Sequence, residues 1–138
     1  MKKIFIICSK AFFNEIDRIK PLLEKKGYEV FVPHTYGKPE SESEWYKKGE
    51  EEHAKMKGLM FKKSRDLIKQ MDAVLCLNFT KNNIENYIGG STFLELYEAF
   101  MEEKKIYLYN GIPSGILYDE IQGFNPIIIN GDLDKIDN

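Results

Sequence analysis

Short runs of almost entirely apolar residues recur along the chain, and each has the length of a buried β-strand. The runs are Ile4–Cys8, Tyr28–Val32, Ala73–Leu77, Ile106–Tyr109 and Ile127–Asn130. Continuous apolar character, rather than alternation of apolar and polar residues, is typical of parallel strands that are covered by helices on both faces. The pattern therefore predicts five strands, the last of them an edge strand that precedes a polar tail.

Between the first two runs, apolar residues recur at helical spacing over residues 12–26. This stripe predicts an amphipathic helix that ends at Gly27, a residue type common just after helix C-termini. Pro21 lies inside the stripe and lacks the backbone N–H that a helix interior needs. We expect Pro21 to kink the helix or to mark a break near Lys20.

The middle of the chain is more polar. Residues 33–44 contain proline, glycine, serine and glutamate and are expected to form the one long loop. Residues 45–71 are rich in charge and carry apolar residues at helical spacing, which predicts a long amphipathic helix. Glycines should interrupt this helix near Gly49 or Gly58.

Two further helices are predicted after the third strand, over residues 91–104 and, shorter, over 114–122. Alternating strands and helices are typical of a doubly wound α/β domain with right-handed crossovers. We expect residues 1–138 to form one such domain, with a flavodoxin-like parallel five-stranded sheet in the order 2-1-3-4-5. The loops 8–11 and 78–91 should then meet at a crevice between strands 1 and 3.

Composition and charge limit the classes of partner that the chain can be expected to bind. The chain has 138 residues and a formal net charge of −2, which gives no reason to expect nucleic acid as a partner. Lysines over residues 47–69 alternate with acidic residues and indicate a solvated helix face. The apolar runs are too short to span a membrane, and the N-terminal run reads as a strand rather than as a signal peptide.

Cysteines and histidines are few. Cys8 and Cys76 fall in or at the end of predicted strands and form no C-x-x-C pair, so we expect reduced thiols in a cytoplasmic protein. His34 and His53 are the only histidines, and neither a metal nor a cofactor is expected. His34 is a weak candidate for the crevice, and His53 is expected to be exposed on the charged helix.

The most informative motif is the segment Gly89–Ala99, which opens the helix after the third strand and is expected to place Glu95 on the first turn of that helix. Helix N-termini in open α/β sheets carry unpaired N–H groups and a partial positive charge, so they favour anions. We expect Glu95 to be ionised there and able to act as a nucleophile or base. The alternative is a capping box, in which Thr92 and Glu95 bond the free N–H groups.

Residues around Glu95 offer ligand contacts. Gly89 and Gly90 would allow the backbone to approach a ligand closely. The hydroxyl of Ser91, with that of Thr92, could donate to a phosphate or a sugar; alternatively one of these two residues is the N-cap.

Two other strand ends should reach the same crevice. Cys8, Ser9 and Lys10 follow the first strand and could hold a phosphate, although the glycines of a phosphate-binding fingerprint are missing. The alternative is an N-cap serine with Lys10 in solvent. Asn78 ends the third strand and suits a ribose or amide contact, or equally a turn.

These motifs together resemble the nucleoside 2-deoxyribosyltransferase superfamily, which includes nucleoside 5′-monophosphate N-glycosidases. The resemblance lies in Lys3–Ser9, Asp72–Asn78, Gly89–Ala99 and Lys105–Leu108. It implies that Glu95 attacks the anomeric carbon of a nucleoside or nucleotide and displaces the base, leaving a glycosyl-enzyme. Water or a second base then completes the reaction, by the carboxylate-nucleophile logic of retaining glycosidases.

Four positions depart from the superfamily pattern. Phe5 stands where a tyrosine commonly hydrogen-bonds the nucleophile, Cys8 replaces a glycine, Gly89 replaces a sugar-binding aspartate, and Tyr97 replaces a glycine. The chain is therefore expected to be either an N-glycosidase-like enzyme or a nucleotide-binding module without catalysis. The resemblance also implies a homodimer or larger homo-oligomer, for which the aromatic pair Trp45–Tyr46 would suit a contact.

Overall fold

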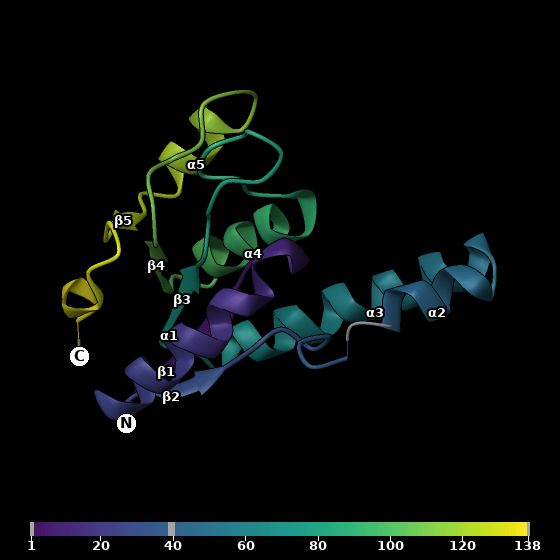
Figure 1. Ribbon diagram of the computed structural model, residues 1–138, viewed down its shortest axis with the longest axis horizontal. Coiled ribbons are helices and arrows are strands. Elements are labelled where there is room, and N and C mark those ends of the chain that lie inside the picture. The colour runs from purple at the N-terminus through teal and green to yellow at the C-terminus, as the bar shows by residue number, and fades with distance from the viewer. Residues whose placement is uncertain (1, 39–40, 138) are drawn as a thin grey trace.

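The computed structural model describes residues 2–38 and 41–137, which contain a five-stranded parallel sheet in the order β2-β1-β3-β4-β5. Helices flank the sheet on both faces (Figure 1). The predicted doubly wound α/β architecture and strand order are confirmed. The strands are β1 (Lys3–Ile7), β2 (Glu29–Phe31), β3 (Ala73–Cys76), β4 (Lys105–Leu108) and β5 (Ile127–Ile128).

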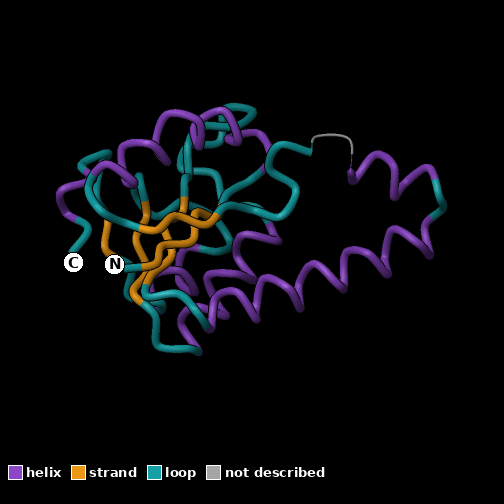
Figure 2. The backbone as a smooth tube through the Cα atoms, turned by 90° about the horizontal axis from the view of Figure 1, so that it is seen from below, coloured by secondary structure: helices purple, strands orange, loops and turns teal. Residues whose placement is uncertain are grey.

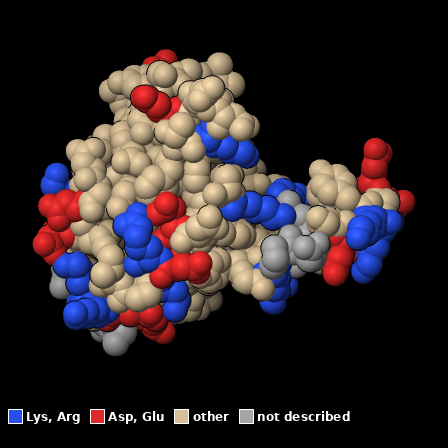
Figure 3. Space-filling view, viewed as in Figure 1, with Lys and Arg blue, Asp and Glu red and all other residues tan. Residues whose placement is uncertain are grey.

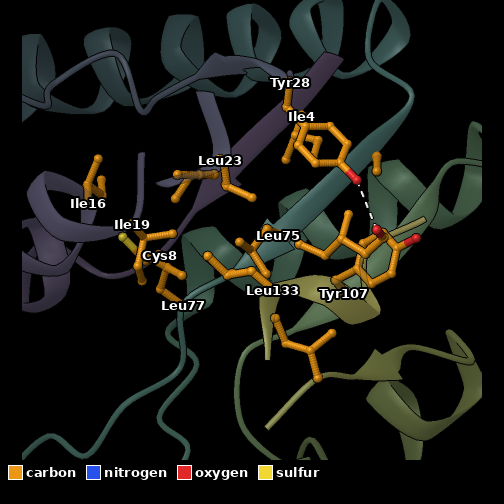
Figure 4. Close-up of a cluster of buried hydrophobic side chains, with 14 of the residues drawn as sticks. Ile4, Cys8, Ile16, Ile19, Leu23, Tyr28, Leu75, Leu77, Tyr107 and Leu133 are labelled. Atoms are coloured by element: carbon orange, nitrogen blue, oxygen red, sulfur yellow. Dashed lines mark hydrogen bonds between the residues drawn. The ribbon is translucent and has the colours of Figure 1, made fainter. Parts of the chain in front are cut away.

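Alternate residues of each strand enter two separate hydrophobic cores, because successive side chains of a strand point to opposite faces. Ile4 and Ile6 of β1 pack with Ile16, Ile19 and Leu23 of helix α1 (Phe13–Lys25). Figure 4 shows part of this core. On the other face, a second core joins strand residues to helices α3 (Glu50–Lys69), α4 (Gly90–Met101) and α5 (Tyr118–Gly123). Its members include Phe5, Ile7, Ile68, Leu96, Ala99 and Ile121. Two buried faces explain why the strands read as continuous apolar runs.

Helix α1 follows a short 3-10 turn, η1 (Lys10–Phe12), and runs through Pro21 as one helix. The predicted break near Lys20 was therefore wrong. The proline ring removes the hydrogen bond that the Asp17 carbonyl group would accept. Both Asp17 and Pro21 are exposed, so water can satisfy that carbonyl group and the helix continues.

Two helices form an arm that leaves the body of the molecule, as Figures 1 and 2 show. Helix α2 (Ser41–Lys47) runs back along the outer part of helix α3 (Glu50–Lys69). The loop predicted over 33–44 was too long, because α2 begins at Ser41; Pro39 and Glu40 lie outside the described residues. The predicted interruption occurs at Gly49, whose φ of 104° lies in the region that favours glycine, whereas α3 continues through Gly58.

The arm carries acidic and basic side chains side by side (Figure 3), in agreement with a solvated surface. His53 departs from the prediction that it is exposed. Its ring is half-buried and stacks on Tyr46, with 3.7 Å between ring centroids, and lies 6.4 Å from the ring of Trp45. Trp45 and Tyr46 therefore pack α2 against His53 of α3. The Tyr46 side chain nevertheless remains 64% exposed.

The last third of the chain contains helices α4 (Gly90–Met101) and α5 (Tyr118–Gly123) and a 3-10 turn, η2 (Leu133–Lys135). Helix α5 begins four residues later than predicted, because Gly115 has a φ of 122° that no right-handed helix contains. Among the residues that the structure describes, no helix is both long and apolar enough to cross a membrane.

The segment after β5, predicted to be a polar tail, packs against the core. Leu133 and Ile136 are buried there, and the Tyr28 hydroxyl donates a 2.8 Å hydrogen bond to the Ile136 carbonyl oxygen, drawn as a dashed line in Figure 4. Apolar residues at positions 133 and 136 close this edge of the sheet, although acidic residues surround them in the sequence.

Candidate active site

A cavity of about 280 Å³ lies where β1, β2 and β3 end, between the body of the sheet and helix α3. Its walls come from the turns after β1 and β2, from α3, and from the first two turns of α4. The predicted crevice at the switch point between β1 and β3 is therefore present. The lining side chains with polar or charged groups are Cys8, Ser9, Lys10, His34, Thr35, Lys57, Ser64, Lys81, Ser91, Thr92 and Glu95.

Glu95 lies in the second turn of α4 rather than the first, and it lines the cavity. The N-cap residue of the helix is Gly89, and no side chain caps the helix. Thr92, the third residue of α4, is 3% exposed. The capping-box alternative was therefore wrong, as was the alternative that Ser91 or Thr92 is the N-cap, and the Glu95 carboxyl group remains available to the cavity.

The carboxyl group of Glu95 is in a partly dehydrated site. Burial raises the pKa of Glu95 to about 7, although a hydrogen bond with the side chain of Ser64 and the charge of Lys57 act to lower it. The expectation that the helix N-terminus keeps Glu95 fully ionised was therefore wrong, because desolvation outweighs these favourable contacts. Near neutral pH a large fraction of the Glu95 carboxyl groups is therefore still ionised, which is the form that can act as a nucleophile or base.

The backbone beside Glu95 is open to the cavity. A methyl group built on Gly90 would meet no atom within 4 Å, whereas one built on Gly89 would lie 3.4 Å from the Tyr87 hydroxyl oxygen. Gly89, Gly90 and Ser91 all line the cavity, as predicted. A ligand can therefore approach the first turn of α4, where backbone N–H groups are not used by the helix.

The turn after β1 provides the opposite wall, and Cys8, Ser9 and Lys10 all line the cavity. Ser9 precedes η1, but its side chain makes no capping hydrogen bond. The Cys8 thiol is buried, and desolvation together with the nearby charge of Glu95 raises its pKa to about 12. Cys8 is therefore a neutral thiol, and a nucleophilic role for it does not fit this environment.

Asn78 is not among the residues that line this cavity. Its side chain is fully buried and hydrogen-bonds the backbone after β4: Nδ2 donates to the carbonyl oxygens of Gly111 (2.8 Å) and Asn110 (3.2 Å). Its Oδ1 accepts from the Asn110 N–H at 2.8 Å. The predicted sugar contact through Asn78 is therefore not supported by its position, because these bonds occupy both ends of the amide.

Several cavity residues were missed from the sequence. Lys57, Met60 and Ser64 of α3 line the cavity, and their spacing of three and four residues places them on one side of the predicted amphipathic helix, which the sequence alone did not connect with the site. Thr35 and Lys81 also reach the cavity from loops. His34, a weak candidate from the sequence, lines it as well, and burial together with the charges of Lys63 and Lys38 lowers its pKa.

Positively charged side chains outnumber negatively charged ones in the lining of the cavity. Among the residues that the structure describes, Lys10, Lys57 and Lys81 line it together with one carboxyl group, that of Glu95. Such a lining favours an anionic ligand. Within residues 2–38 and 41–137, no group of three or more histidine, cysteine, aspartate or glutamate side chains is placed to hold a metal ion.

No protein-family model matches the chain, and a sequence comparison with curated proteins gives no match. Among solved structures, the chain is similar to the CMP N-glycosidase BcmB of Clostridium botulinum, with a TM-score of 0.49 and 19% sequence identity. The similarity covers 92% of this chain and 85% of the other.

Proposed function

We propose that this chain cleaves the N-glycosidic bond of a nucleotide-like compound in the cavity between β1 and β3, with Glu95 as the nucleophile. The observation that carries the proposal is the position of the Glu95 carboxyl group. It borders a cavity at the switch point of an open α/β sheet, where such folds bind ligands. Its pKa of about 7 leaves a large fraction of reactive carboxylate at neutral pH.

The proposed reaction has two steps. In the first, a Glu95 oxygen forms a bond to the anomeric carbon while the bond to the base nitrogen breaks, and the base leaves with the electron pair and takes up a proton. In the second, water or another base attacks the same carbon and gives up a proton to the solvent, and the bond to the Glu95 oxygen breaks so that the carboxylate is released. The superfamily resemblance of the sequence implies this course, and a carboxylate is required because it is both nucleophile and leaving group.

The remaining lining groups suit the rest of such a substrate. Ser9, Lys10, Gly90 and Ser91 flank the cavity from two sides and are proposed to hold a phosphate or the sugar hydroxyl groups. The additional lysines of the lining favour a phosphorylated ligand over a neutral nucleoside. No cofactor takes part in this proposal.

The first experiment is a measurement of free-base release from ribonucleosides, deoxyribonucleosides, their monophosphates and NAD. Base released by the wild-type chain and not by Glu95→Gln is the expected result. Glu102→Gln is the matched control, because Glu102 follows the last residue of the same helix and does not line the cavity. Base release by Glu95→Gln at the wild-type rate would contradict the assignment of the nucleophile.

The alternative is a nucleotide-binding module that uses the same cavity without catalysis. The observation in its favour is Phe5, a buried phenyl ring at a position where the superfamily places a hydroxyl near the nucleophile. A ligand that raises the melting temperature while no base is released from any compound would establish this alternative.

We also propose that the chain forms a homodimer in which the arm contacts the partner. The arm projects from the body and leaves Tyr46, Leu59 and Phe61 exposed. Sedimentation velocity at micromolar concentration should give the mass of two chains, and a monomer would contradict the proposal.

A further inference from the structure

We propose that Ser64 is a positioning residue for Glu95: its hydroxyl group, presented by α3, holds the Glu95 carboxyl group in the orientation required for attack. The inference rests on the proposed function, because it assigns Ser64 a part in the same reaction. Ser64 does not belong to the segments from which the sequence predicts a site. Ser64 comes to lie beside Glu95 because α3 packs against α4.

The geometry shows why Glu95 needs to be held. Glu95 and Ser64 both line the cavity between β1 and β3, and both also line a second cavity of about 130 Å³. The second cavity lies between the outer faces of α3 and α4 and is completed by Phe61, Leu94 and Glu98. The pair of Ser64 and Glu95 is therefore shared by the walls of two spaces.

A glutamate side chain has three rotatable bonds, and space on two sides allows it several rotamers. A rotamer directed into the second cavity would withdraw the carboxyl group from the substrate. The hydrogen bond with Ser64 opposes such movement, since Ser64 lies on a different helix from Glu95 and α3 packs against α4. Because reaction rates fall steeply when reacting atoms are misplaced by about 1 Å, this contact matters for catalysis.

The hydrogen bond between Ser64 and Glu95 favours the ionised form of the Glu95 carboxyl group, which is the form that attacks. A hydroxyl group donates one hydrogen bond to an ionised carboxylate and leaves its second oxygen free to attack. Hydrogen bonds to the charged form lower a carboxyl pKa, and Ser64 acts in that direction on Glu95. The charge of Lys57 also lowers the pKa of Glu95. The other charged or titratable groups that face it line the two cavities or pair with a lining residue and must be kept constant in a test; these are Cys8, Lys10, His34, Lys81, Glu98 and Arg65.

Three variants test the inference. Ser64→Ala removes the hydroxyl group, and Ser64→Thr keeps it. Alanine is the better helix former, and Ser64 is only half-buried, so Ser64→Ala is expected to fold. Ser43→Ala, an exposed serine of α2, is the matched control.

Two readouts are needed. The first is the pH profile of kcat and KM for base release; Ser64→Ala should lower kcat by about 10–100-fold with KM little changed, and Ser64→Thr should recover most of the loss. The second is the titration of the Glu95 carboxyl carbon by NMR, which requires no activity. There the pKa of Glu95 should rise by about 0.5–1 unit in Ser64→Ala and stay unchanged in Ser43→Ala.

The outcomes separate this inference from the proposed function. An unchanged kcat and an unchanged Glu95 titration in Ser64→Ala would overturn the inference while leaving Glu95 as the nucleophile. If the wild-type chain releases no base from any compound, the proposed function fails, and with it the catalytic meaning of Ser64. In that case the NMR titration still decides whether Ser64 holds the carboxyl group. If Ser64→Ala does not fold, Ser64→Cys, which has similar volume and a weak donor, takes its place in both measurements.

Discussion

Asn78 and Asn110 hydrogen-bond each other's backbone. The Asn78 Oδ1 atom accepts from the Asn110 N–H at 2.8 Å, and the Asn110 Nδ2 atom donates to the Asn78 carbonyl oxygen at 3.0 Å. This reciprocal pair joins the ends of β3 and β4 and fixes the start of the long loop that leads to α4. An asparagine that reads as a ligand contact in the sequence is thus part of the frame that supports the cavity.

Asn78→Ala should therefore destabilise the fold without a specific effect on ligand binding. Loss of the amide leaves a partly buried N–H and two partly buried carbonyl oxygens without this partner, and we expect the free energy of unfolding to fall by about 1–3 kcal/mol. Chemical denaturation measures this change. Asn78→Asp should be at least as harmful, because its carboxylate would face two carbonyl oxygens; a fully stable aspartate variant would contradict this account.

The pH dependence of base release should report Glu95. Attack requires the ionised carboxyl group, so kcat/KM should rise with pH through about 7 and level off above it. The pKa of His34 is lowered, so its titration should be complete at lower pH, and His34→Ala separates the two. A profile that already levels off near pH 5 would show that Glu95 titrates as an ordinary glutamate.

The same pKa shift predicts a pH-dependent stability. The folded chain holds the Glu95 proton more tightly than the unfolded chain, since the pKa rises from 4.5 to about 7. The free energy of unfolding should therefore decrease as pH increases from about 4.5 through about 7, by about 3 kcal/mol from this group, and stay level above. Glu95→Gln removes this loss, so the variant should be more stable than wild type at pH 8 and equal to it at pH 4. Thermal melts at the two pH values test this, and equal differences at both would contradict it.

Gly90→Ala should separate stability from ligand binding. The added methyl group meets no protein atom within 4 Å and projects from a residue that lines the cavity. We expect unchanged stability, or a gain of about 0.5 kcal/mol, together with weaker nucleotide binding measured by calorimetry. Gly123→Ala in α5, also without a contact within 4 Å, is the control and should bind as wild type does. Equal affinity of both variants would indicate that the ligand does not approach the first turn of α4.

The contacts of the C-terminal segment should contribute to stability. Ile136 is 5% exposed within the core beside α1, so Ile136→Ala should lower the free energy of unfolding by about 2–4 kcal/mol. Tyr28→Phe, which removes the hydrogen bond to the Ile136 carbonyl group, should cost about 1 kcal/mol. Ile116→Ala is the control, because Ile116 is 93% exposed and its truncation should have almost no effect. Denaturant midpoints of the three variants provide the comparison.

Most of the fold could be predicted from the sequence because buried parallel strands carry an unmistakable apolar pattern. The errors arose where solvent or tertiary contacts decide the outcome. Pro21 does not end α1, since the freed Asp17 carbonyl group faces water. The segment containing Leu133 and Ile136 looks polar, yet its two apolar side chains fill the edge of the core.

The site could be predicted only in part. The segments around Ser9 and Glu95 follow strands or open a helix, so sequence order alone places them at the crevice. Ser64 and Lys57 reach it because α3 packs against α4 at a particular rotation about its axis, which no local pattern specifies. Likewise, the raised pKa of Glu95 depends on burial by neighbours distant in the sequence. The position of Glu95 near a helix N-terminus, taken alone, predicts a lowered pKa instead.

Helix α3 is one continuous rod of 20 residues, about 30 Å long, which belongs to the core at Ile68 and to the arm at its other end. Each residue inserted into a helix turns everything beyond it by about 100°. An insertion between Ser64 and Ile68 would therefore rotate Ser64 and Lys57 away from Glu95 together. Insertions near Glu50 would only lengthen the arm. Natural variation in chain length should accordingly be confined to the part of α3 before Lys57, with the stretch from 57 to 68 kept at a fixed number of residues.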